Sequence, residues 1–465
     1  MTESLRQAGS YKLLEFKISD FMGNTRTVPI SQAENPELVK DQIDAKFHIY
    51  QWNIGESLYG NNTNGMASVL DAVGLFYDFP LRGEEKLTVK YEDWFGEERE
   101  EEFFIHSISD IRPAKIGNSS ILAYNLHFVS IGKFISETRM IRRSFGGRIS
   151  DTVDTVFRDY FKTGPNGTEG TKKNIVIDAT IGNQTVVIPN YNGEEAMNFL
   201  ARRAYGGPDS TSSFMFFETR ENYYFRTYEN IVESAIARNE EDRSFRPIPT
   251  YRWNLLMDDA GIGQYHKMGN ILNLNFGNPF STLSDMNAGA YYKQTFEIDI
   301  LNLNTRYTNY NHFNRFPRYN ELLARNDQTI VPNHSREFAE KFMTEGQRYL
   351  VIQDYPNPSE NDRPYVRNRT FYSDLISHKW ATAYHHARNG ISITVYGRNT
   401  LFPGSIAELD LNQFRFQTGN LDHTFSGKYL VDSVMNNFVG DTYTQTLSLH
   451  RGGIGSRKEA SNMIS

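Results

Sequence analysis

The sequence contains no cysteine among its 465 residues, which excludes disulfide bonds, thiolate metal ligands and cysteine nucleophiles. It also lacks a long apolar run: no stretch reaches the roughly 18 to 20 residues of a membrane-spanning helix. The mean hydropathy is −0.56. The first residues have no apolar core of the roughly 7 to 15 residues that a secretion signal requires. These absences predict a protein that works without disulfides and without inserting into a membrane.

An excess of basic residues is missing too. The chain has 49 Lys and Arg against 56 Asp and Glu, a formal net charge of −7. A protein that holds nucleic acid through its phosphates usually carries a clear basic excess. The balance argues against a DNA-binding module and is compatible with a channel through which DNA merely passes.

Aromatic residues, in contrast, are abundant, with 27 Tyr, 32 Phe and 4 Trp. Tyr and Phe favour the pleated surface of strands, and they also favour buried interfaces, where a rigid ring loses little side-chain entropy. This composition predicts many strands and extensive contact between subunits.

The first part of the chain has the period of two that is typical of half-buried strands. Leu87, Val89 and Tyr91 alternate with polar residues, and residues 122–128 repeat the pattern. The acidic run at 96–102 between them indicates the solvated tip of a hairpin. We therefore predict an antiparallel β domain over residues 1–138, a small barrel or sandwich.

Helical spacing begins after Gly147, with apolar residues on one face of 149–161. Asn192, followed three residues later by Glu195, forms a capping box that begins a second helix. Strand-like runs lie between and after these helices. Residues 139–250 are therefore predicted to form an α+β connecting domain.

The last part returns to strand patterns, at 272–276, 296–300, 391–395 and 443–449, with shorter runs at Phe414 and Phe416 and at Tyr429 and Val431. Residues 251–301 and 385–452 are predicted to form a second β-barrel domain. It is interrupted by an insertion at 302–384, rich in Asn, Arg, Tyr and Pro, with a short helix around Phe338 and Phe342 and a longer one from Tyr372. Residues 453–465 are expected to be a flexible tail. The predicted fold class is α+β, mainly β, with two similar antiparallel β-barrel domains joined by an α+β segment.

No pattern of catalytic or ligand-binding residues stands out. There is no HExxH, no phosphate-binding P-loop and no GxSxG. His385 and His386 are neighbours, which point about 100° apart on a helix and grip a metal poorly. Asp258 and Asp259 precede a glycine-rich turn, where Asp is favoured for backbone hydrogen bonding. We therefore predict that the chain is not an enzyme and has no metal, catalytic or cofactor-binding site.

Four segments, taken in order, resemble a known family. They are Ser57-Leu58-Tyr59-Gly60 with Asn64-Gly65-Met66 and Asp71; Pro80-Leu81-Arg82-Gly83-Glu84-Glu85 before the 87–91 strand; Ser144-Phe145-Gly146-Gly147 and Val187-Ile188-Pro189, each before a helix; and Leu401-Phe402-Pro403-Gly404 with Gly427-Lys428-Tyr429-Leu430-Val431-Asp432 and the 443–449 strand. Together they resemble the central baseplate hub protein of contractile-tailed bacteriophages of the T-even type, which is related to the hub part of type VI secretion spike proteins. The 302–368 stretch has no counterpart in this pattern.

The resemblance implies a structural role in the virion, at the tail baseplate, after assembly in the bacterial cytoplasm. Such hubs are homotrimers with two β-barrels per chain, so six barrels form a pseudo-sixfold ring. The ring is an adaptor between the sixfold tail tube, or a tube-initiator protein, and a threefold central spike, which is here expected to be a separate polypeptide. Baseplate wedge proteins would surround it. Genomic DNA would pass through a central channel without specific binding, and an acidic lumen would favour this passage.

Ser57, Leu58, Tyr59, Phe402 and Tyr429 are the candidates for contact with another subunit or partner, together with the insertion and the tail. Two alternatives stay open. One is the hub of a type VI secretion or tailocin-like injection machine, which would share the fold. The other is a glycan-binding or carbohydrate-active β protein, which predicts a carboxylate pair and aromatic side chains gathered in one cleft.

Overall fold

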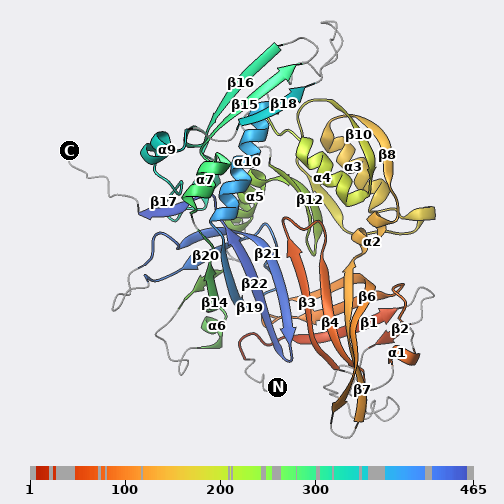
Figure 1. Cartoon of the computed structure of the whole chain (residues 1–465). Helices are drawn as coiled ribbons and strands as arrows, with labels where there is room; N and C mark the ends of the chain where they lie inside the picture. Colours follow the sequence, from red (N-terminus) through yellow and green to blue (C-terminus); the bar gives the residue numbers. More distant parts are fainter. Residues whose placement is uncertain are drawn as a thin grey trace.

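The computed structural model describes most of the chain. The described residues are 7–19, 25–27, 48–71, 75–78, 81–116, 119–207, 210, 213–241, 248–253, 263–278, 280–299, 304–316, 319–344, 348–353, 372–413 and 421–457. The strands of the predicted β domains share one large sheet in the lower half of Figure 1, and the connecting segment and the insertion stand above it.

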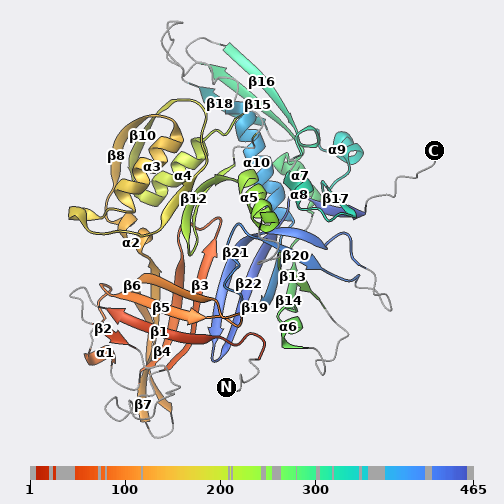
Figure 2. The ribbon, with the colours of Figure 1, turned by 180° about the vertical axis from the view of Figure 1, so that it is seen from behind.

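The first β half contributes seven strands to this sheet. Their bounds are β1 Lys12–Ser19, β2 Thr25–Thr27, β3 His48–Ser57, β4 Asn64–Asp71, β5 Lys86–Glu92, β6 Glu98–Ile116 and β7 Ser119–Ser130, with helices α1 Leu75–Asp78 and α2 Ile131–Glu137. The predicted hairpin is confirmed, since β5 pairs with β6 around a turn at 93–97. The acidic run is not its solvated tip, however, because residues 98–102 lie within β6 and Glu101 is buried. Inward-facing side chains such as Trp52, Phe103 and Phe128 form its core. From behind, β1, β5 and β6 lie in front of β3 and β4, so the core lies between two layers (Figure 2).

The second β half contributes β13 Thr250–Arg252, β14 Ile271–Phe276, β19 Ile391–Tyr396, β20 Ile406–Asp410, β21 Gly427–Val439 and β22 Thr442–His450, with helix α6 Gln264–Lys267. Its separate core includes Ile393, Leu409 and Leu447. The alternation at 391–395 and 443–449 is confirmed, because every second side chain there is buried.

One long strand joins the two halves. The first part of β21 pairs with β20, from Ile406↔Leu430 to Leu409↔Gly427. After an irregularity at Val431–Ser433, its second part pairs with β3, from Ser433↔Ser57 to Val439↔Gln51. The sheet therefore has 13 strands, in the order β14-β19-β22-β21-β3-β4-β7-β6-β5-β1-β2, with β20 and β13 branching from β21. The mainly β, α+β class is confirmed, but two separate barrels are not, since none of the sheets among the described residues closes on itself.

The connecting segment forms a small α+β unit at the upper right of Figure 1. Its elements are β8 Ile141–Gly147, α3 Ile149–Tyr160, a 3-10 turn Pro165–Gly167, β9 Asn174–Ile177, β10 Gln184–Tyr191, α4 Gly193–Arg203, β11 Phe214–Glu218, β12 Asn222–Thr227 and α5 Tyr228–Glu241. The capping box is confirmed: Asn192 Oδ1 accepts from the Glu195 N–H at 2.8 Å, and the Asn192 N–H donates to Glu195 Oε2 at 3.1 Å. Phe157, Leu200 and Tyr223 pack in its core.

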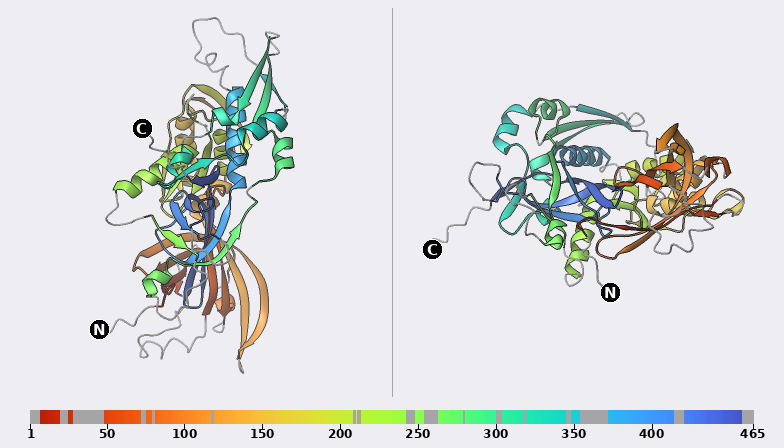
Figure 3. Two further views of the ribbon diagram at one scale, coloured as in Figure 1. Left: turned by 90° about the vertical axis from the view of Figure 1, so that its left-hand side faces the viewer. Right: turned by 90° about the horizontal axis from the view of Figure 1, so that it is seen from below.

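The insertion is more regular than its sequence predicts. It contains β16 Asn304–Asn311, a 3-10 turn His312–Asn314, α8 Tyr319–Leu322, β17 Gln328–Val331, α9 Arg336–Phe342, β18 Arg348–Gln353 and most of α10 Tyr372–Arg388. Helix α7 Thr282–Ala288 and strand β15 Tyr292–Asp299 directly precede it. The helix expected around Phe338 and the one from Tyr372 are confirmed as α9 and α10. Strand β15, which the alternation at 296–300 places with the second β half, pairs instead with β16 and β18. Figure 3 shows that this three-stranded sheet stands away from the main sheet, at the far end of α10.

The expected flexible tail begins as a strand, β23 Ile454–Arg457, which pairs with β17 of the insertion. The two strands pair through backbone hydrogen bonds, which need no alternation of apolar side chains, so the polar residues of the tail do not indicate a strand. The expected strand at Phe414 and Phe416 lies outside the described residues.

Candidate functional site

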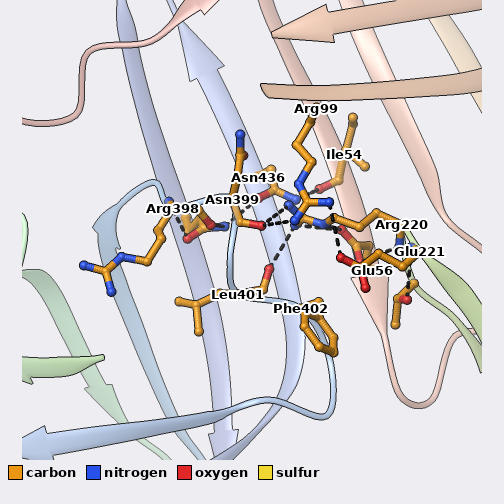
Figure 4. Close-up of polar contacts among 12 residues, drawn as sticks. Ile54, Glu56, Arg99, Arg220, Glu221, Arg398, Asn399, Leu401, Phe402 and Asn436 are labelled. Atoms are coloured by element: carbon orange, nitrogen blue, oxygen red, sulfur yellow. Dashed lines mark hydrogen bonds and ion pairs between the residues drawn. The ribbon is translucent and has the colours of Figure 1, made fainter. Parts of the chain in front are cut away.

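The turn between β11 and β12 projects from the connecting segment to the place where the two β halves meet. It carries Arg220, whose side chain is 1% exposed, and it reaches Glu56 of β3, which is 0% exposed. The two charges are 3.0 Å apart. Arg220 also donates to the backbone carbonyls of Asn399 at 3.0 Å and Leu401 at 2.9 Å, in the loop that follows β19 (Figure 4). One guanidinium therefore joins all three parts of the chain.

The last residue of β11, Glu218, lies just before this turn, is fully buried and contacts the first β half. Its carboxylate accepts from the Thr63 N–H at 3.0 Å and from the Ser130 hydroxyl, and Lys173 Nζ lies 2.8 Å from it. Glu56, Glu218, Lys173 and Arg220 each have a charged or hydrogen-bonded partner, as buried charges require. The arrangement fixes the orientation of the connecting segment on the sheet.

A second arginine extends the network toward the hairpin tip. Arg99 of β6 lies 3.3 Å from Glu221 and donates to the Asn399 carbonyl at 3.0 Å. The Asn399 N–H in turn donates to Asp93 at 2.8 Å. Beside them, burial and the nearby Glu56 charge raise the pKa of Glu101. This is a buried polar junction, which we define as Glu56, Arg99, Glu218, Arg220 and Asn399.

Three of the five predicted contact residues, Ser57, Leu58 and Tyr59, lie at the end of β3 beside the junction. Leu58 is 1% exposed and donates its N–H to the Asp432 carbonyl at 2.7 Å, and it packs in one cluster with Phe217 and Ile406. Ser57 accepts from the Tyr59 N–H at 3.2 Å. Tyr59 is 60% exposed as a whole residue, so of the three it alone is a large hydrophobic residue open to solvent.

Phe402 and Tyr429 lie elsewhere on the second half. Phe402 is half-buried in a turn closed by the Ser405 hydroxyl, which donates to its carbonyl at 2.6 Å. Tyr429 is 1% exposed, donates to the Phe425 carbonyl at 2.7 Å, and has the Arg451 guanidinium 4.5 Å above its ring. Tyr429 and Leu58 therefore have internal packing roles, while contacts through Ser57, Tyr59 and Phe402 stay predictions.

A hollow of about 430 Å³ opens beside Tyr59, between β11, α4 and α10, with Met215, Arg202 and His386 in its walls. Lys379 of α10 also borders it, and donates to the carbonyls of Ala201, Arg202 and Ala204 at 3.0 to 3.2 Å, at the end of α4. Burial lowers the pKa of Lys379 to about 7. These bonds use the three donors of the ammonium group, so Lys379 acts as a cap for the helix rather than as a ligand group.

The two adjacent histidines point to different partners, as the helix geometry predicts. His385 Nε2 is 3.0 Å from the Ala290 carbonyl, and His386 Nδ1 is 3.0 Å from the Tyr228 hydroxyl. Across the described residues, no group of three or more His, Asp or Glu is arranged to hold a metal ion. No helix in that part of the chain is long and apolar enough to cross a membrane. Asp258 and Asp259 lie outside the described residues.

The buried junction was missed in the sequence, although one signal was present. Trp52, Ile54 and Glu56 of β3 and Leu58 just after it stand at every second position, so the period places Glu56 on the buried side. A carboxylate at an inward position requires a buried partner. No comparable local pattern identifies Arg220 as that partner.

No protein-family model and no curated protein sequence matches the chain. Solved structures do. A tail protein from Neisseria meningitidis aligns with 96% of this chain and 98% of its own, at a TM-score of 0.51 and 10% identity. The 43 kDa tail protein of prophage MuSo2 from Shewanella oneidensis aligns with 94% of this chain and 98% of its own, at a TM-score of 0.50 and 10% identity. An E. coli type VI secretion component, itself described as similar to bacteriophage T4 tail proteins, aligns less well. The alignment covers 90% of this chain and 78% of that one, at a TM-score of 0.40 and 8% identity.

The chain therefore has the fold of phage tail proteins over nearly its whole length. The resemblance to a baseplate hub drawn from the four sequence segments is confirmed as a likeness of fold.

Proposed function

We propose that this chain is the structural subunit of a phage tail baseplate hub, without catalytic activity. The observation that carries the proposal is the end-to-end likeness of fold, which extends to 98% of the length of a tail protein. The four sequence segments support it independently, since they occur in the order expected of a hub.

In this proposal three chains form a ring, and each β half of the chain supplies one of six similar units around it. The pseudo-sixfold ring adapts the sixfold tail tube, or its initiator, to a threefold central spike, and wedge proteins surround it at the baseplate of the virion. DNA passes through the central channel without specific binding. Such an adaptor needs the angle between its two β halves to be fixed, and the continuous β21–β3 pairing with the buried polar junction supports this.

Light scattering on the purified chain tests the proposal. The expected mass is three times 53.6 kDa, about 161 kDa. A monomer at high protein concentration that stays monomeric with the spike protein present would contradict it. A monomer that binds glycans would favour the carbohydrate-binding alternative instead.

A further inference from the structure

The outward side of the central strands carries no charged residue over a wide area. We call this area the neutral face and define it as the outward positions of β14 (273–275), β19 (392–394), β22 (444–448), β21 (433–439), β3 (51–57), β4 (64–68) and β7 (125–129). The pairing registers align these positions in rows that cross both β halves. One row reads Asn273, Thr394, Thr446, Met435, Gly55 and Asn64.

Charged residues make up 23% of the whole sequence, so the absence of charge from these outward positions does not follow from a low charge content of the chain. Charge returns at its margins, at Asp110 and Arg112 of β6 and at the exposed Asp441 in the turn between β21 and β22. In Figure 1, β3 and β4 are seen from the side turned away from β1, β5 and β6. Met435 is 40% exposed and Val439 is 48% exposed, so the face is open in the single chain.

The opposite layer of the first β half provides an internal comparison. On β1, β5 and β6 the outward side chains are almost all charged, and one row reads Glu15, Lys90 and Glu100. Thr88 is an exception there, in register with Lys17 and Glu102. The same fold unit is therefore charged on one side and neutral on the other, which indicates that the two sides meet different neighbours.

Part of the neutral face is tied by hydrogen bonds within it and to its margin. Ser68 donates to Asn125 at 2.7 Å, Asn125 donates to Asp110 of β6 at 2.7 Å, and the Ser109 hydroxyl of β6 lies 2.8 Å from His127 Nε2. A buried contact between subunits would show more aromatic and aliphatic side chains than these Ser, Thr and Asn residues.

A surface without Lys and Arg does not hold phosphate tightly, because binding to DNA comes mainly from Lys and Arg that displace counterions. We propose that the neutral face lines the channel of the hub ring and that double-stranded DNA slides along it. This inference rests on the proposed function, and it replaces the expected acidic lumen with a neutral one.

The test uses the absence of cysteine from the sequence. Thr446→Cys on the neutral face and Thr88→Cys on the charged layer each create one labelling site by the same chemical change. Spin labels at these sites give distances between copies in the assembled trimer by double electron–electron resonance. We expect the Thr446→Cys labels to be closer to one another than the Thr88→Cys labels, because they face a common axis.

Equal or reversed distances in a trimer would overturn the inference and leave the proposed function standing. So would loss of maleimide reactivity at Thr446→Cys on assembly, because the face would then lie against another copy. If no trimer forms at all, the proposed function itself fails, which is a distinguishable result.

Lysine at the same two positions tests the chemistry. In the trimer, Thr446→Lys places three cations around the channel, and we expect it to bind duplex DNA roughly tenfold more tightly than wild type at low salt, with loss of binding as salt rises. Thr88→Lys is expected to bind no more tightly than wild type. If Thr446→Lys binds DNA no better than Thr88→Lys, the neutral face does not meet DNA.

Discussion

Arg220 and Glu56 are 164 residues apart in the sequence and form an ion pair of 3.0 Å with both side chains excluded from solvent. Burial alone would lower the pKa of Arg220, but the Glu56 carboxylate raises it, so the guanidinium stays charged. The pair holds the connecting segment against the seam between the β halves.

Arg220→Met is expected to destabilise the fold by about 3 to 5 kcal/mol, because it leaves the Glu56 carboxylate buried without its charged partner. The shift of the urea midpoint measures this cost. Arg158→Met is the matched control, since its ion pair with Asp154 is exposed, at 63% and 56%, and is expected to contribute well under 1 kcal/mol. Equal shifts for the two variants would show that the junction contributes nothing beyond an exposed ion pair.

Gly65→Ala is expected to destabilise the first β half by about 1 to 3 kcal/mol, because the added methyl group would overlap the Asn53 carbonyl and the Phe128 ring. Thermal unfolding measures the effect. Gly146→Ala, whose added methyl group meets nothing within 4 Å, serves as the control and should unfold close to wild type. A Gly65→Ala protein as stable as the control would contradict the close packing of β3, β4 and β7.

Stability is expected to fall as the pH drops from about 6.5 toward 4. Burial lowers the pKa of His378 and His385 to about 4 and that of His312 and His386 well below its usual value, whereas an unfolded histidine titrates near 6.5. The unfolded chain therefore binds more protons in this window, so the histidines' contribution is full above about pH 6.5 and is lost below it.

His385→Phe removes one of these histidines and leaves in place the charged or titratable groups that face it, which are Asp285, His334 and Arg388. Buried carboxylates such as Glu101 and Glu194 have raised pKa values and act in the opposite direction, so the comparison must be made with wild type. The thermal midpoint of His385→Phe should fall less between about pH 7 and pH 4.5 than that of wild type. An identical slope would mean that His385 does not change its protonation on unfolding.

Arg451→Lys is expected to loosen the end of the described chain. The Arg451 guanidinium donates to the carbonyls of Gly453 at 3.0 Å and Ser426 at 3.1 Å, a geometry that a single ammonium group does not reproduce. Hydrogen exchange should become faster in β17 and β23 and stay unchanged in β3 and β4. Faster exchange throughout the sheet would instead indicate that Arg451 supports the whole second half.

Local signals in the sequence predicted the local structure. The alternation at Leu87, Val89 and Tyr91 identified a strand whose inward side chains are fully buried, and Asn192 with Glu195 identified the first residue of a helix. These patterns depend on neighbours two to four positions apart, so they can be recognised without knowing the rest of the fold.

Long-range pairing could not be predicted in this way. Nothing within β21 shows that its second part leaves β20 and pairs with β3, and this is why two separate barrels were expected. Arg220 likewise lies in an ordinary polar turn, and its partners come from elements 164 and 179 residues away. The outward residues of single strands look unremarkable until the registers place them in one neutral face.

Electron microscopy of the purified assembly tests the central claim most directly. The account predicts threefold particles in which six β halves surround an open channel, with β3, β21 and β22 turning their neutral face toward the axis. A particle with a different number of copies, or without a channel, would contradict the account.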